Sequence, residues 1–75
     1  VDFLNDYKST LQELVQTNKK SVSYVLVHEG GPSHKKYFVV NAVIDGIVYG
    51  TGKGGSKKDA EQHAAKEAID KCVGD

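Results

Sequence analysis

The feature that most constrains the fold is a glycine-rich segment that runs directly into an alanine-rich one. Residues 50–55 read Gly-Thr-Gly-Lys-Gly-Gly, and the pattern from Ser56 onward is typical of a helix. Ser56 is a favourable N-cap residue, and Asp59 places an acid in the first turn. Small side chains recur every fourth residue, which would let this helix lie close against a sheet. This row consists of Ala60, Ala64, Ala68 and Cys72, and Ala65 and Ile69 widen it.

The start of this helix is suited to an anion such as phosphate, because its first backbone N–H groups are unpaired and the helix dipole is positive there. Residues 50–55 also match the glycine pattern of dinucleotide-binding folds, but that motif needs a second parallel strand after the helix. The sequence runs to Asp75 without such a strand. A Walker motif needs lysine before the hydroxyl residue, whereas Ser56 precedes Lys57 here. We therefore expect neither dinucleotide binding nor nucleotide hydrolysis.

Length and composition indicate one small domain, residues 1–75, with a core of about 6–72. Cys72 is the single cysteine, so no internal disulfide can form, which favours a reducing, cytoplasmic setting. No apolar run reaches membrane-spanning length and no signal-peptide pattern is present, so we expect no membrane partner. The sequence starts at Val1 rather than methionine, which suggests a piece of a longer protein.

The charge pattern is more informative than the total charge. The formal net charge is zero at pH 7, which taken alone argues against a nucleic-acid partner. Lysines nevertheless cluster at positions 35–36, 53 and 57–58, while the acidic residues are scattered. Arginine is absent, which disfavours bidentate recognition of guanine in a DNA major groove.

The hydrophobic pattern predicts an α+β fold of order α-β-β-β-α, in which a three-stranded antiparallel sheet has two helices packed on one face. The first helix is expected from Asp6 to about Thr17, with Asn5 or Asp6 as its N-cap. Its apolar residues are Tyr7, Leu11, Leu14 and Val15. The strands are expected at Val22–Glu29, Lys36–Ile44 and Ile47–Thr51. Asp45-Gly46 is a strong hairpin-turn signal, and glycine and proline make residues 30–34 a loop.

The first helix has a second, polar row opposite its apolar one. The row consists of Ser9, Gln12, Glu13 and Gln16. One interpretation is an ordinary solvated helix face. The other is a set of hydrogen-bonding groups that fits the wide, shallow minor groove of RNA with its 2′-hydroxyls.

Three motifs, taken in order, resemble those of a known family. They are Tyr7-Lys8-Ser9-x-Leu11-Gln12-Glu13, Gly31-Pro32-Ser33-His34 and Gly52-x-Gly54-Gly55-Ser56-Lys57-Lys58-x-Ala60. With the element order, they make the chain resemble a double-stranded RNA-binding domain, in particular the C-terminal domain of bacterial ribonuclease III. The resemblance covers nearly the whole chain, from about Asp6 to Cys72.

The resemblance implies two minor-groove contacts. The polar row of the first helix would enter one groove, where the Glu13 carboxylate can accept hydrogen bonds from 2′-hydroxyls or guanine amino groups. The loop that contains Pro32 and His34 would enter the next groove. Without the resemblance, His34 would be interpreted as an ordinary exposed loop histidine.

The resemblance also implies phosphate contacts by Lys57 and Lys58, across the intervening major groove. Lysine opposes the helix dipole at this end, so two lysines favour a bound anion over the alternative of a solvated helix start. Many members of the family have a third lysine where this chain has Glu61. The acid is common in the ribonuclease III branch, and it implies weaker phosphate binding. Lys53 would partly compensate from the preceding loop.

The implied partner is duplex RNA of about 16 base pairs, recognised by shape, and not B-form DNA. The chain itself would have no enzymatic activity and no cofactor, because His28, His34, His63 and Cys72 lack metal-ligand spacing and no nucleophile–base set is present. In a ribonuclease III parent, the magnesium-binding catalytic domain, which could also mediate homodimer formation, would lie outside this chain. The alternative is a family domain that serves as a protein-interaction or dimerisation module.

Overall fold

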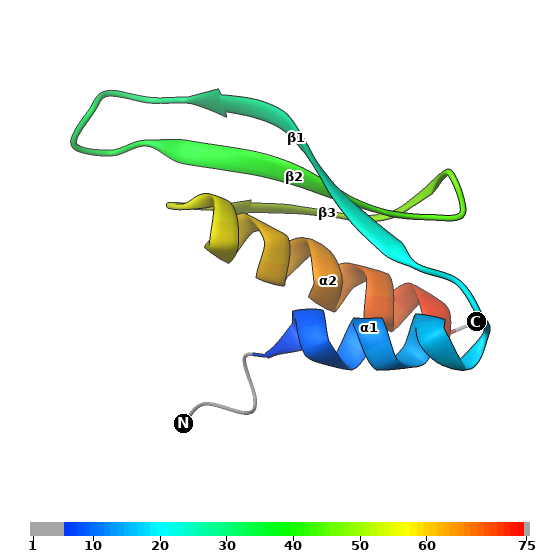
Figure 1. Ribbon diagram of the computed structural model, residues 1–75. Helices are drawn as coiled ribbons and strands as arrows, with labels where there is room; N and C mark the ends of the chain where they lie inside the picture. The colour runs from blue at the N-terminus through cyan, green and yellow to red at the C-terminus, as the bar shows by residue number, and fades with distance from the viewer. Residues whose placement is uncertain (1–5, 75) are drawn as a thin grey trace.

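The computed structural model describes residues 6–74, which form a two-layer α+β domain. The elements are α1 (Tyr7–Thr17), β1 (Val22–Gly30), β2 (Tyr37–Ile44), β3 (Ile47–Gly54) and α2 (Lys57–Gly74). The antiparallel sheet has the order β1-β2-β3, and both helices lie on the same side of it and pack against each other (Figure 1). The predicted element order and fold class are confirmed.

Close contact between α2 and β3 depends on the glycine-rich segment. The side chains of alternate strand residues face the same way, and Gly50 and Gly52 face α2. A Cβ atom on either would overlap backbone atoms of α2: Ala64 and Ala68 at Gly50, and Ala60 and Ala64 at Gly52. Glycine on the strand and alanine on the helix therefore bring the two backbones together, as the small-residue row predicted.

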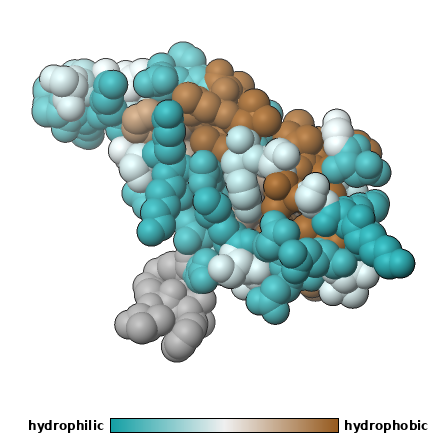
Figure 2. Space-filling view, in the orientation of Figure 1, coloured by the Kyte–Doolittle hydropathy of each residue, from teal (hydrophilic) through white to brown (hydrophobic). Residues whose placement is uncertain are grey.

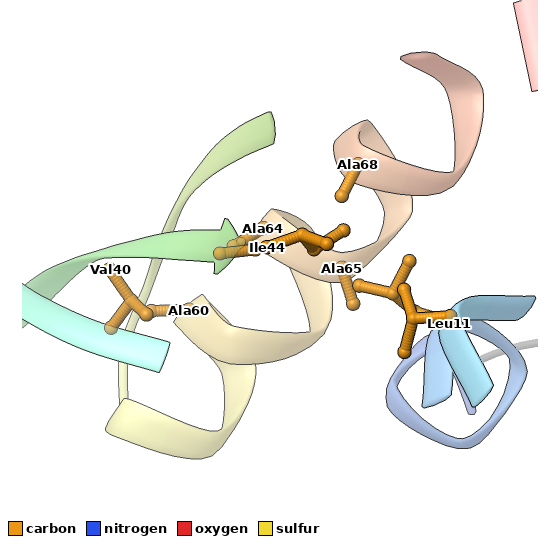
Figure 3. Packing of buried hydrophobic residues seen from close by; sticks show 9 residues of the cluster. Leu11, Val40, Ile44, Ala60, Ala64, Ala65 and Ala68 are labelled. Atoms are coloured by element: carbon orange, nitrogen blue, oxygen red, sulfur yellow. The ribbon is translucent and has the colours of Figure 1, made fainter. Parts of the chain in front are cut away.

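The core lies between the layers. Its fully buried side chains come from α1, β2 and α2, and Figure 3 shows Val40 and Ile44 pointing from the sheet toward the alanines of α2, with Leu11 on the other side of that helix. The buried set is Leu11, Val15, Val40, Ala42, Ile44, Ala60, Ala64, Ala65 and Ala68.

Cys72 is the exception in the predicted helix row, because it is exposed. At 3.6 residues per turn, each step of four residues rotates the side chain by about 40°, so Cys72 lies about 120° around the helix from Ala60. The prediction that Cys72 belongs to the sheet-facing row was therefore wrong.

The turns and helix starts follow the sequence signals. Asp45 and Gly46 have φ values of 56° and 77°, as a two-residue type I′ hairpin requires. Asp6 is the N-cap of α1, where its side chain accepts a hydrogen bond from the Ser9 backbone at 3.4 Å. Asn5, the other predicted cap, lies outside the described residues.

The strand boundaries were predicted less well. β3 continues to Gly54, beyond the predicted end at Thr51, because residues 52–54 pair with β2 as far as Phe38. Glycine usually weakens a strand, and here pairing and the contact with α2 outweigh that tendency. β1 extends one residue further, to Gly30, and β2 begins at Tyr37 rather than Lys36.

Candidate nucleic-acid interface

Three of the predicted contact segments lie along one side of the molecule. In Figure 1 the β1–β2 loop, the start of α2 and the first turn of α1 follow one another down the left side. In Figure 2 hydrophilic residues cover the loop end and the helix side, while hydrophobic residues gather along the sheet. Segments that are distant in sequence thus form one polar side.

The polar row of α1 is available for intermolecular contacts. Ser9, Glu13 and Gln16 are exposed and Gln12 is partly buried, while Leu11 and Val15 on the opposite side are buried. Within residues 6–74, no hydrogen bond or ion pair engages the side chains of these four polar residues. Their hydroxyl, amide and carboxylate groups are therefore free to bind a ligand.

The β1–β2 loop has a defined turn at its start. Gly31 has a φ of 89°, and a Cβ atom there would overlap the Lys35 carbonyl oxygen. The Lys35 backbone N–H donates to the Pro32 carbonyl oxygen at 2.8 Å. Pro32 and His34 are both exposed on this turn, so the loop presents them outward.

The start of α2 is capped as predicted. The Ser56 hydroxyl accepts a hydrogen bond from the Asp59 backbone N–H at 3.1 Å. Ser56 therefore satisfies one of the N–H groups at the start of the helix. The positive charges at this site are the side chains of Lys57 and Lys58. Both are exposed, and Lys58 borders a hollow of about 390 Å³ between the starts of the two helices.

Lys53 lies apart from the other two lysines of the site. It is a residue of β3 rather than of the preceding loop, and it pairs with Val39 on the sheet face away from α2. The Lys53 Nζ lies 4.5 Å from the centre of the Tyr37 ring. The Tyr37 hydroxyl forms a hydrogen bond with His28 Nε2 at 3.1 Å. Lys57 and Lys58 thus lie at the start of α2, whereas Lys53 lies on the sheet and lines a hollow with Pro32 of the β1–β2 loop.

Glu61 faces α1, where it forms an ion pair with Lys8. Its neighbour Gln62 accepts a hydrogen bond from the Lys8 backbone N–H at 3.0 Å. From the sequence, Glu61 was expected only as an acid in place of a phosphate-binding lysine, and no contact with Lys8 and no role for Gln62 was predicted. These contacts join residues 53 and 54 positions apart, so no local sequence pattern could have predicted them.

Tyr24 of β1 lies beside this ion pair. The Lys8 Nζ is 5.0 Å from the centre of its ring, and its hydroxyl is buried with no hydrogen-bond partner among the described residues. Burial, reinforced by the nearby Glu61 carboxylate, raises the pKa of Tyr24 to about 12. The phenol is therefore neutral at physiological pH.

Other kinds of site find no support in the described residues. In residues 6–74 no three histidine, cysteine or acidic side chains come together as a metal site. His63, one of the histidines considered, donates from Nδ1 to the Lys53 carbonyl oxygen at 2.6 Å, since a carbonyl can only accept. None of the helices in this part of the chain is long and apolar enough to cross a membrane.

Fold and surface together define a small α-β-β-β-α domain with one polar, lysine-bearing side. The profile of the double-stranded RNA binding motif matches residues 7–72. The chain is 45% identical over 71 residues to Ribonuclease 3 of Aster yellows witches'-broom phytoplasma, covering 95% of this chain and 30% of that protein. It is 52% identical over 66 residues to Ribonuclease 3 of Oceanobacillus iheyensis, covering 87% of this chain and 29% of that protein.

A solved structure of Arabidopsis HYL1, described in connection with miRNA processing, is similar over 91% of this chain and 97% of that chain. The TM-score is 0.78 and the sequence identity 37%. The chain belongs to the double-stranded RNA binding motif family. It spans about 30% of the length of the Ribonuclease 3 proteins that it matches.

Proposed function

We propose that this chain binds double-stranded RNA by shape, through two successive minor grooves and the phosphates between them. The observation that carries the proposal is that α1, the β1–β2 loop and the start of α2 present free polar and cationic groups on one side. Such a surface can span about 16 base pairs of A-form duplex without reading its sequence.

Each segment has a role in this proposal. The row Ser9, Gln12, Glu13 and Gln16 contacts the first minor groove, and Pro32 and His34 contact the second. Lys57 and Lys58 neutralise phosphates across the major groove between them. Lys53, which lines a hollow beside Pro32 of the β1–β2 loop, partly compensates for the missing third lysine. B-form DNA binds poorly, because its groove widths differ and it lacks the 2′-hydroxyl.

We also propose that the chain is the RNA-binding part of a ribonuclease III that processes structured RNA. The support is the similarity to Ribonuclease 3 proteins, of which it covers about 30%. Cleavage and the magnesium ions that it requires then belong to a catalytic domain outside this chain. We assign no reaction to the residues described here.

The test is fluorescence anisotropy with an RNA duplex of about 20 base pairs and the DNA duplex of the same sequence, at several salt concentrations. Preferential RNA binding that weakens with salt supports the proposal. Equal or absent binding to both would instead favour a protein-interaction module. The exposed valines of the outer sheet face, Val25 and Val48, would then be the first surface to study.

A further inference from the structure

The position of α1 depends mainly on α2. α1 packs along α2, and it also contacts the sheet at β1, where the Tyr24 ring lies beside Lys8. Figure 3 shows the buried Leu11 of α1 beside Ala65 of α2, and Val15 belongs to the same buried cluster. Such apolar contact is non-directional, so by itself it does not fix how far α1 is displaced along or rotated against α2.

Directional contacts between the helices come from one turn of α2. The Glu61 carboxylate pairs with the Lys8 ammonium, and the Gln62 side-chain oxygen accepts the Lys8 backbone N–H at 3.0 Å. That N–H is one of the unpaired groups in the first turn of α1, so Gln62 caps α1 from the neighbouring helix. Main chain and side chain of Lys8 are thus both held.

The Lys8–Glu61 ion pair is partly buried, so it can contribute to the position of α1. The Lys8 and Glu61 side chains are 37% and 25% exposed, and the Tyr24 ring covers the ammonium from the sheet side. Partly buried pairs are screened less by salt than exposed ones. By contrast, the Lys66–Asp70 pair on the same helix is 54% and 71% exposed and joins residues within α2 only.

We propose that Glu61 and Gln62 are positioning residues for RNA recognition, which hold α1 through Lys8 at the distance from Lys57 and Lys58 that duplex RNA requires. The inference rests on the proposed function. Lys8 begins the turn that carries Ser9 and Gln12, and Glu61 and Gln62 lie one turn beyond the lysine pair. Recognition of the duplex by shape needs the polar row of α1 and the lysine pair of α2 at a fixed separation. The contacts of Lys8 with Glu61 and Gln62 connect these two segments.

The positioning role predicts a change in RNA affinity opposite to the one that electrostatics alone predicts for Glu61→Gln. Glu61→Gln removes a negative charge near a polyanion and releases the Lys8 ammonium, so electrostatics predicts tighter RNA binding and a steeper salt dependence. Loss of the positioning contact instead predicts weaker binding, by about three- to tenfold, with a salt slope that does not steepen. Glu61→Asp keeps the charge but shortens the side chain, so it should also weaken binding.

The experiment compares the unchanged chain, E61Q, E61D and the matched control Asp70→Asn against an RNA duplex of about 20 base pairs. Circular dichroism at the binding temperature confirms that each variant is folded. Gln12→Ala is then added to the unchanged chain and to E61D. With α1 displaced, removal of Gln12 should cost less affinity in E61D than in the unchanged chain, whereas a general loss of stability would leave its cost the same.

Weaker binding by E61Q and E61D, unchanged binding by D70N, and a smaller effect of Q12A in E61D are the expected results. Equal or tighter binding by E61Q and E61D, while the unchanged chain binds normally, would overturn the positioning role alone. If the unchanged chain itself fails to bind RNA, the proposed function and this inference fall together.

Discussion

Helix α2 makes two contacts of different kinds. Toward β3 the contact is close, with Gly50 and Gly52 leaving no room for any side chain. Toward α1 it combines small alanines with polar contacts from Glu61 and Gln62. The first contact is set by shape and tolerates no added atom, whereas the second is set by charge and hydrogen bonds. α1 is therefore the more adjustable part of the proposed RNA-binding surface.

The largest expected effect comes from adding a side chain at the close contact between β3 and α2. Gly52→Ala should lower the free energy of unfolding by on the order of 3 kcal/mol, because the new Cβ would overlap the backbone of α2 rather than a flexible side chain. Thermal and urea unfolding measure the loss. Gly55→Ala is the matched control, since a Cβ there meets nothing within 4 Å. A G52A chain as stable as G55A would contradict the close-contact description.

The next effect separates the phosphate contacts from the groove contacts. Lys58→Ala should weaken binding of all duplex RNAs alike, by about 1 kcal/mol, and should make the salt dependence shallower. Gln12→Ala should weaken binding with little change of the salt slope, because an amide releases no counterions. Anisotropy titrations at several salt concentrations measure both, with Lys66→Ala as a control on the same helix. Unchanged affinity in both variants would remove the proposed surface.

The smallest expected effect concerns Tyr24 of β1, whose ring lies beside Lys8 of α1. Its pKa is raised from 10.0 to about 12, so the folded state favours the neutral phenol. This contribution is complete below pH 10 and is lost as the pH rises through the folded-state pKa of about 12. Tyr24→Phe should lose less stability than the unchanged chain as the pH rises from about 10 to about 12.

At neutral pH the same substitution should change stability by less than about 0.5 kcal/mol, because it removes a hydroxyl that has no hydrogen-bond partner in the described part of the chain. Phenylalanine keeps a ring for the Lys8 ammonium to contact. Chemical unfolding of both chains across the alkaline range is the measurement. Identical pH dependence in the two chains would show that Tyr24 does not titrate as described.

The local signals in the sequence predicted the local structure well. The Asp45-Gly46 turn and the Ser56 cap depend on residues within a few positions of one another, and both are present. The glycines at 52–54 were predicted as a loop because local preference is against a strand, and tertiary contact with α2 overrides that preference. The helix periodicity also misplaced Cys72, since an i, i+4 row turns away from the sheet over three steps.

For the candidate site as well, features that depend on nearby residues could be predicted, and contacts between distant residues could not. Exposure of Lys57, Lys58 and His34 could be anticipated from their positions in a helix start and a loop. The role of Glu61 could not, because its partner Lys8 lies 53 residues away and meets it only when the helices pair. Lys53 was placed with the other lysines in a loop, whereas strand pairing turns it to the opposite face.

We propose that RNA binds the side formed by α1, the β1–β2 loop and the start of α2. The most direct test is to titrate an RNA duplex of about 20 base pairs into the isotope-labelled chain and follow the backbone amide signals by NMR. We expect the largest changes in residues 9–16, 31–36 and 56–58. Changes centred instead on Val25 and Val48, on the outer face of the sheet, would contradict it.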